Sequence, residues 1–175
     1  RAEVTGSRES WAGRSTSVVA AGSYPELARR GWQAVGVDFV PAAIEPARSR
    51  GTNGATYVVG DVTELEAAVL RTFDLFLDIG CFQVLMPTSG WAVGRGVSVL
   101  ANPGATLLIL AFGPRRWGAA VGAESREDVE TAFADWQLLI AEPADAQGLA
   151  ADEPDGTALV PAAPTVAALV PCDSV

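Results

Sequence analysis

Short apolar runs alternate with segments of helical character along most of this 175-residue chain. Runs of this length, bounded by Gly, Pro, Asn and Asp, are typical of buried strands, and the segments between them are long enough for helices. We expect strands at 16–21, 32–38, 56–59, 73–79, 105–112 and 136–141, and helices at 23–30, 41–50, 63–70, 87–100 and 125–133. This alternation predicts an α/β fold with three layers, a doubly wound and mostly parallel sheet with helices on both faces.

Local signals refine these elements. Ser23-Tyr24-Pro25-Glu26 and Thr63-Glu64-Leu65-Glu66 have capping-box spacing at the start of two predicted helices. Pro46 removes a hydrogen bond inside a third, so we expect it to kink or shorten that helix. Asn102-Pro103-Gly104 predicts a turn before the most apolar strand.

Three regions are expected. Residues 1–17 are polar and without periodicity and predict a loose leader, residues 18–143 carry the Rossmann-like domain, and residues 144–175 form a tail. In the tail, Ala158-Leu159-Val160-Pro161 recurs as Ala168-Leu169-Val170-Pro171. We expect one of these two segments to form an edge strand and the rest of the tail to have little order.

Carboxylates end three successive strands of the predicted sheet: Asp38, Asp61 and Asp78. The carboxyl ends of parallel strands share one edge, and ligands bind in the crevice outside that edge. Asp38 would be placed there to accept two hydrogen bonds from the vicinal hydroxyls of a ribose. The alternative for Asp38 is a residue that ends a strand and caps a turn, since such motifs also arise by chance.

Composition excludes several kinds of partner. All 12 basic residues are Arg, and the last is Arg126. Ten Asp and Glu residues follow Arg126, and the net charge of the whole chain is −9. This balance repels phosphate backbones, so no nucleic-acid partner is expected. The longest apolar run, about 107–112, is far shorter than the ~20 residues of a spanning helix, and no signal-peptide pattern is present. We therefore expect a cytoplasmic protein without a membrane partner.

The chain has no His and no Lys, which excludes a Ser-His-Asp triad, histidine metal ligands, a Schiff-base lysine and a P-loop. Cys81 and Cys172 are the only cysteines, so neither a disulfide framework nor a zinc site is supported, and we expect no metal. Cys81 follows a strand near the predicted crevice, but it has no basic neighbour to activate it as a nucleophile. A buried structural thiol is the favoured interpretation, and any chemistry would depend on a cofactor.

Several segments together resemble a known family. They are Leu27–Trp32, Val35-Gly36-Val37-Asp38-Phe39, Gly60-Asp61-Val62, Phe73–Phe82 and Pro103-Gly104-Ala105. In combination, from about residue 27 to 142, they resemble class I S-adenosylmethionine-dependent methyltransferases. The likeness is greatest to small bacterial methyltransferase-domain proteins akin to thiopurine methyltransferases.

This resemblance implies a cofactor, S-adenosylmethionine, and a small-molecule methyl acceptor as partner. Asp38 would bind the ribose hydroxyls and Phe39 would lie beside the adenine. Asp61 would accept from the adenine amino group, with the Val62 N–H nearby. The methionine end and the methyl group would be bordered by Asp78, Ile79 and Gly80. Methyl transfer to a soft nucleophile needs alignment more than acid–base chemistry, so the resemblance names no catalytic side chain.

One segment departs from the family pattern. The first strand of the family is followed by a GxGxG-type turn, whereas residues 17–26 here contain only Gly22, with Tyr24 and Pro25 in place of small residues. The first alternative is therefore a non-catalytic or truncated relative that keeps the fold without binding the cofactor. The second is a nicotinamide-dependent oxidoreductase, because Asp38 would serve its ribose equally well. That class needs a glycine fingerprint before the Asp, which is absent.

Overall fold

The computed structural model describes residues 15–19, 24–51, 53–69, 71–111, 125–144 and 165–172. In these residues the strands are β1 (Ser15–Val19), β2 (Gln33–Asp38), β3 (Ala55–Val59), β4 (Phe73–Ile79), β5 (Ala101–Ala111), β6 (Trp136–Pro143) and β7 (Thr165–Pro171). The helices are α1 (Tyr24–Arg29), α2 (Pro41–Arg50), the 3₁₀ turn η2 (Val62–Glu64), α3 (Leu65–Ala68), α4 (Cys81–Leu100) and α5 (Arg126–Ala132).

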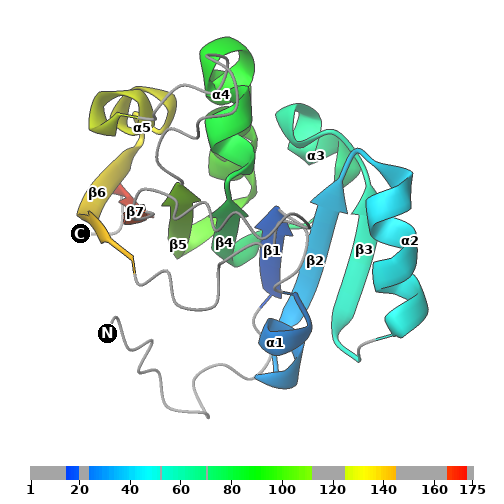
Figure 1. The fold of residues 1–175 in the computed structure, drawn as a ribbon. Helices are drawn as coiled ribbons and strands as arrows, with labels where there is room; N and C mark the ends of the chain where they lie inside the picture. The colour runs from blue at the N-terminus through cyan, green and yellow to red at the C-terminus, as the bar shows by residue number, and fades with distance from the viewer. Residues whose placement is uncertain are drawn as a thin grey trace, which may run out of the picture.

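All seven strands belong to one sheet, in the order β3-β2-β1-β4-β5-β7-β6 (Figure 1). The pairs β2–β3, β1–β2, β1–β4 and β4–β5 are parallel, and β7 is antiparallel to both β5 and β6. Strand order reverses direction at β1, with β2 and β3 on one side and β4 and β5 on the other. The predicted α/β, doubly wound and mostly parallel architecture is confirmed.

Strand β7 lies inside the sheet, so the expectation of an edge strand in the tail is wrong for this segment. Leu169 stands opposite Leu107 of β5 and is fully buried, and Ala167 is buried as well. An apolar strand with neighbours on both sides satisfies both rows of its backbone groups, which an edge position does not. The other segment considered for this role, residues 158–161, lies outside the described residues. At the other end, β1 begins at Ser15, ahead of the predicted domain start at residue 18.

Two local signals have a different outcome from the one predicted. Helix α2 runs unbroken from Pro41 to Arg50 in spite of Pro46. Asn102-Pro103-Gly104 lies within β5 beside a shift in its register with β4, with Gly104 at φ 76°. It is therefore a strand irregularity and no chain reversal. Its Asn102 side chain donates to Asp74 Oδ1 at 3.0 Å and ties the two strands together there.

The sheet has an apolar cluster on each face. Ile44 of α2 and Tyr57 of β3 pack with Leu27 of α1 on one face. The larger cluster lies on the other face, where α3, α4 and α5 cover the sheet (Figure 1). Its largest fully buried side chains are Phe73, Phe76, Phe82, Phe133, Leu65, Leu107, Ile109 and Leu169. Each helix thus buries one apolar stripe against the sheet, the arrangement expected of a three-layer α/β fold.

Helix α4 depends on glycines for its packing. A Cβ at Gly94 would overlap the carbonyl oxygen of Ala132 in α5, and a Cβ at Gly96 would lie 3.1 Å from Leu65 Cβ. These glycines lower helix propensity, but they let two backbones approach each other closely. Packing against α5 and α3 therefore outweighs the propensity of this segment.

We predict that Gly94→Ala lowers the free energy of unfolding by about 1–3 kcal/mol or more, because overpacking forces α4 and α5 apart. Gly90→Ala is the matched control on the same helix. Its Cβ would meet only side-chain atoms, Phe82 Cε2 at 3.1 Å and Met86 Cγ at 3.3 Å, which can move. Urea denaturation of the two variants compares them. Equal stabilities would contradict this account of α4.

Candidate functional site

Asp38, Asp61 and Asp78 lie along the same edge of the sheet, the carboxyl ends of its parallel strands. Asp38 stands opposite Val59 of β3, and the N–H of Gly60 donates to the Asp38 carbonyl at 3.0 Å, which places Asp61 directly beyond that pair. Asp78 stands opposite Val19 of β1. The sequence prediction that three strand-ending carboxylates share one edge is confirmed.

Asp38 is half-buried, and its own loop holds one of its carboxylate oxygens. Oδ1 accepts the Val40 N–H at 2.8 Å, where the chain turns from β2 into α2. Both readings of this residue are therefore compatible with the structure, since one oxygen supports the turn while the other remains available. Within the described residues, no hydrogen bond reaches Asp38 Oδ2.

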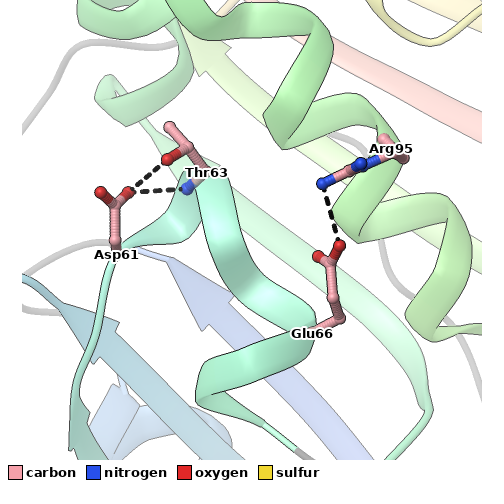
Figure 2. Close-up of polar contacts among 4 residues, drawn as sticks. All are labelled: Asp61, Thr63, Glu66 and Arg95. Carbon is pink, nitrogen blue, oxygen red and sulfur yellow. Dashed lines mark hydrogen bonds and ion pairs between the residues drawn. The ribbon is translucent and has the colours of Figure 1, made fainter.

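Like Asp38, Asp61 uses one of its two carboxylate oxygens for hydrogen bonds within its own loop. Its Oδ1 accepts from the Thr63 N–H and from the Thr63 hydroxyl, both at 2.8 Å (Figure 2). The cap of η2 is therefore Asp61, and the predicted capping box starting at Thr63 is wrong; the helix that follows ends at Ala68. An Asp followed two residues later by Thr was the available signal. The same two bonds from Thr63 lower the pKa of Asp61, so this exposed carboxylate stays ionised at neutral pH.

Exposed apolar side chains lie between these two carboxylates along the chain. Phe39 is 75% exposed, and Val40 and Val59 are also exposed. Phe39 and Val40 follow β2 directly, and Val59 is the last residue of β3, paired with Asp38. An aromatic face flanked by aliphatic side chains and carboxylates suits a flat heteroaromatic ring attached to a sugar. Sequence reasoning identified Phe39 but missed Val40, Val59 and Thr63.

The segment that carries Asp61 is also fastened to α4. Glu66 Oε1 of α3 forms an ion pair with Arg95 Nη2 of α4 at 3.0 Å (Figure 2). Both side chains are partly exposed, so the pair contributes about 1 kcal/mol at most. The buried side chains of Val62 and Leu65 hold η2 and α3 on the sheet more strongly, because they belong to the main core.

The sequence and the fold can both be compared with known proteins. A family model described as "Methyltransferase domain" matches residues 19–109, more than half of the chain. The chain belongs to the methyltransferase-domain family. The resemblance predicted from the sequence is thereby confirmed at the level of the family, whereas the finer likeness to thiopurine methyltransferases stays a prediction.

Solved structures share the fold at low identity. One, which concerns the conversion of a disulfide bond into a thioacetal group during echinomycin biosynthesis, has a TM-score of 0.73 at 18% identity over 96% of this chain and 80% of that one. The N-methyltransferase NodS from Bradyrhizobium japonicum WM9 has 0.67 at 17%, over 93% and 88%. The glycopeptide N-methyltransferase MtfA, solved with S-adenosylmethionine, has 0.67 at 14%, over 95% and 89%. A search of curated proteins found no match.

S-adenosylmethionine, the cofactor expected from the sequence, agrees with this family and with these neighbours. The edge of the methyltransferase domain described above fits the nucleoside half of that cofactor: Asp38 and Asp61 each keep one carboxylate oxygen outside the loop hydrogen bonds, and Phe39, next to Asp38 in the chain, is exposed. The segment in which the family has its glycine-rich turn, between β1 and α1, contains residues 20–23, which lie outside the described residues.

The remaining predicted site residues of the methyltransferase domain take different positions. The Val62 side chain is buried in the core, so only its backbone N–H, the first of η2, faces outward from the helix. Gly80 adopts φ 73°, and its N–H donates to the Leu110 carbonyl at 3.0 Å. That bond extends the β4–β5 pairing and occupies the donor, so Gly80 and half-buried Ile79 border the site through their position alone.

Asp78 is 5% exposed and directs both carboxylate oxygens at the start of α4. Oδ1 accepts from the Cys81 N–H at 3.1 Å, and Oδ2 from the Phe82 N–H at 2.9 Å. These bonds explain why α4 begins at Cys81, earlier than the predicted start at Pro87, since they satisfy donors that a helix leaves open. Asp78 thus positions α4, and its contact with a ligand stays a prediction.

The charges of all three carboxylates affect the pKa of the Cys81 thiol. Burial raises the pKa of its thiol to about 12, and the charges of Asp78, Asp38 and Asp61 add to the effect. A thiol this weakly acidic stays protonated at neutral pH, which favours the structural interpretation over the nucleophilic one. Within the described part of the chain, no group of His, Cys, Asp or Glu residues is arranged to hold a metal ion.

A hollow of about 500 Å³ lies at the opposite edge of the methyltransferase sheet. Its lining includes Asn102 at the start of β5, Trp136 at the start of β6 and Cys172 after β7. It is therefore separate from the carboxylates. Among the described helices, none is both long and apolar enough to cross a membrane.

The burial of Asp78 leads to a pH prediction. Removal from water raises its pKa from 3.8 to about 7, and the N–H donors of Phe82 and Cys81 offset only part of the shift. The folded state therefore binds more protons than the unfolded state between these values. Protonated Asp78 therefore adds to the free energy of unfolding. This stabilisation is complete below about pH 4 and is lost as the pH rises through about 7.

Asp78→Asn removes that titration but keeps an oxygen for the Phe82 N–H. We expect the unfolding free energy of the variant, relative to the parent chain, to rise by up to a few kcal/mol between about pH 4 and pH 8. Urea denaturation across that range measures it. A difference that is flat with pH would show that Asp78 does not titrate there.

Proposed function

We propose that this chain is an S-adenosylmethionine-dependent methyltransferase that methylates a small molecule. The observation that carries the proposal is the shared edge of the sheet, which has the carboxylates of Asp38 and Asp61 together with the exposed side chains of Phe39 and Val59. In this proposal Asp38 Oδ2 accepts from the ribose hydroxyls, Phe39 covers the adenine and Asp61 accepts from its amino group. The Val62 N–H donates to the ring.

The charge of the edge supports a cationic ligand over an anionic dinucleotide. The charges of Asp38 and Asp61, which lie nearer the surface than buried Asp78, both act on the Cys81 thiol, so these two carboxylates reinforce each other at this edge. Their field attracts the sulfonium of S-adenosylmethionine and repels a pyrophosphate. The nicotinamide-dependent alternative therefore has the electrostatics against it, in addition to lacking a glycine fingerprint before Asp38.

When bound, the cofactor would supply an electrophilic methyl group carried by a sulfonium sulfur. The chain itself contributes alignment, which supplies much of the acceleration of methyl transfer. Asp78 holds the start of α4, and Gly80 links β4 to β5, so the backbone beside the reacting centre is held on two sides. A net charge of −9 disfavours nucleic acid as acceptor and leaves small molecules as the favoured class.

A non-catalytic relative is the second candidate. Only residues 20–23, Ala-Ala-Gly-Ser, separate the end of β1 from the start of α1. This segment has one glycine in place of a GxGxG turn, and Pro25 contributes no N–H. Such a chain would keep the fold but no longer bind the cofactor. Binding and methyl transfer must therefore be measured separately.

The binding test is a calorimetric titration with S-adenosylmethionine. We expect Asp38→Ala to weaken binding by about 10–100-fold, the range set by losing hydrogen bonds to a charged acceptor. Asp38→Asn keeps Oδ1 for the Val40 N–H and controls for damage to the loop. Asp135→Ala, which removes an exposed carboxylate at the opposite edge, should bind like the parent chain. Equal binding by parent, Asp38→Ala and Asp135→Ala would refute the assignment of Asp38.

The transfer test offers a panel of small thiols, amines and phenols with S-adenosylmethionine carrying a labelled methyl group. Methylation of any of them, reduced in Asp38→Ala when the cofactor is below saturation, supports the enzyme. Absence of cofactor binding by the folded chain, together with no transfer to any member of the panel, would favour the non-catalytic candidate.

A further inference from the structure

The turn that leads into β3 carries an Asn-Gly pair, Asn53-Gly54. Asn53 is exposed, and Gly54 adopts φ 87°, a left-handed conformation that side chains disfavour. Within the described residues, neither the Asn53 carboxamide nor the Gly54 N–H forms a hydrogen bond. The amide is therefore free to rotate, and no side chain at position 54 shields the following backbone nitrogen.

From this arrangement we propose that Asn53 is a site of spontaneous deamidation. The Gly54 nitrogen attacks Asn53 Cγ and forms a five-membered succinimide ring. The side-chain nitrogen leaves as ammonia and carries away the proton lost by Gly54. Water then opens the ring at either of its two carbonyls. The products are a normal aspartyl or an isoaspartyl residue at position 53, each with one more negative charge than the original.

The other asparagine of the chain is a built-in control. Asn102 precedes Pro103, whose nitrogen has no hydrogen and cannot close the ring. Its amide also donates to Asp74 Oδ1 at 3.0 Å. Both differences protect Asn102, so of the two asparagines only Asn53, in the turn before β3, is expected to deamidate in the folded chain.

The isoaspartyl form changes the main chain as well as the charge. Its backbone passes through the side chain and gains one methylene immediately before Gly54, whose carbonyl accepts the Ala34 N–H at 2.7 Å. That bond lies at the start of the β2–β3 pairing, which runs from Ala34 opposite Ala55 to Asp38 opposite Val59. We expect the isoaspartyl form to weaken the attachment of the edge strand β3, whereas the normal aspartyl form leaves its path unchanged.

The test incubates the folded full chain in mildly alkaline buffer and follows two tryptic peptides, residues 51–71 and 96–115, by liquid chromatography and mass spectrometry. We expect the Asn53 peptide to give way to two acid-containing isomers that separate on the column, while the Asn102 peptide stays unchanged. A parallel sample unfolded in urea gives the rate without structural restraint. If the folded chain keeps Asn53 intact while the unfolded sample converts, the proposal is wrong.

Two variants separate the consequences. Asn53→Gln keeps a carboxamide but would need a six-membered ring, so it should resist conversion and keep its melting temperature during incubation. Asn53→Asp carries the added charge without the extra methylene, and it should melt close to the fresh parent chain. A fall in the melting temperature of Asn53→Gln equal to that of the incubated parent would show that the loss arises elsewhere.

Discussion

The parallel pairing of β2 with β3 is the interaction on which the candidate site depends. It sets Asp38 opposite Val59, and the Gly60 N–H continues the pairing to the Asp38 carbonyl. Because side chains alternate between faces, a slip of one residue would exchange the faces of every side chain on β3. The buried side chains of Val35 and Val37 on β2 oppose such a slip, since they belong to the main core. The core therefore determines where the two carboxylates lie relative to each other.

The carboxylates at this edge serve the fold as well as the proposed ligand. Asp38 and Asp61 each use Oδ1 to close a turn, and Asp78 uses both oxygens at the start of α4. A carboxylate that is already hydrogen-bonded keeps its orientation without a further entropic cost when a ligand arrives. Asp78 is the exception, because its burial makes it costly to ionise and its bonds point into the protein. The three residues thus look alike in the sequence and differ in what they can bind.

The sequence predicted the class of fold, the shared edge and the family, because these depend on patterns that extend over many residues. Alternating apolar runs and helical segments determine a parallel sheet, and Asp38, Asp61 and Asp78 follow from where the runs end. Local signals were less reliable. Thr63 has the spacing of a cap, yet Asp61 takes that position because its carboxylate reaches two donors. In the sequence, Gly94 indicates only a lower helix propensity. The structure shows that a glycine is needed there because the backbone of Ala132 packs against it.

The place of β7 could not be read from the sequence either. Its position between β5 and β6 depends on long-range packing of Leu169 against the sheet, and a strand in a weakly patterned tail carries no sign of its partners. Exposure was similarly hidden: Val40 and Val59 have the composition of core residues and lie at the surface beside Phe39. Such residues are identified by the edge of the sheet they occupy, which only the three-dimensional arrangement supplies.

In the proposed function, the edge of the sheet that carries Asp38 and Asp61 receives the nucleoside of the cofactor. Backbone amide NMR of the isotope-labelled chain, titrated with the demethylated cofactor S-adenosylhomocysteine, tests it most directly. We expect shifts concentrated at residues 38–40, 59–63 and 78–82, which lie at the carboxyl ends of β2, β3 and β4. Shifts confined to the opposite edge, around Asn102, Asp135 and Cys172, or none at any residue of the folded chain, would contradict it.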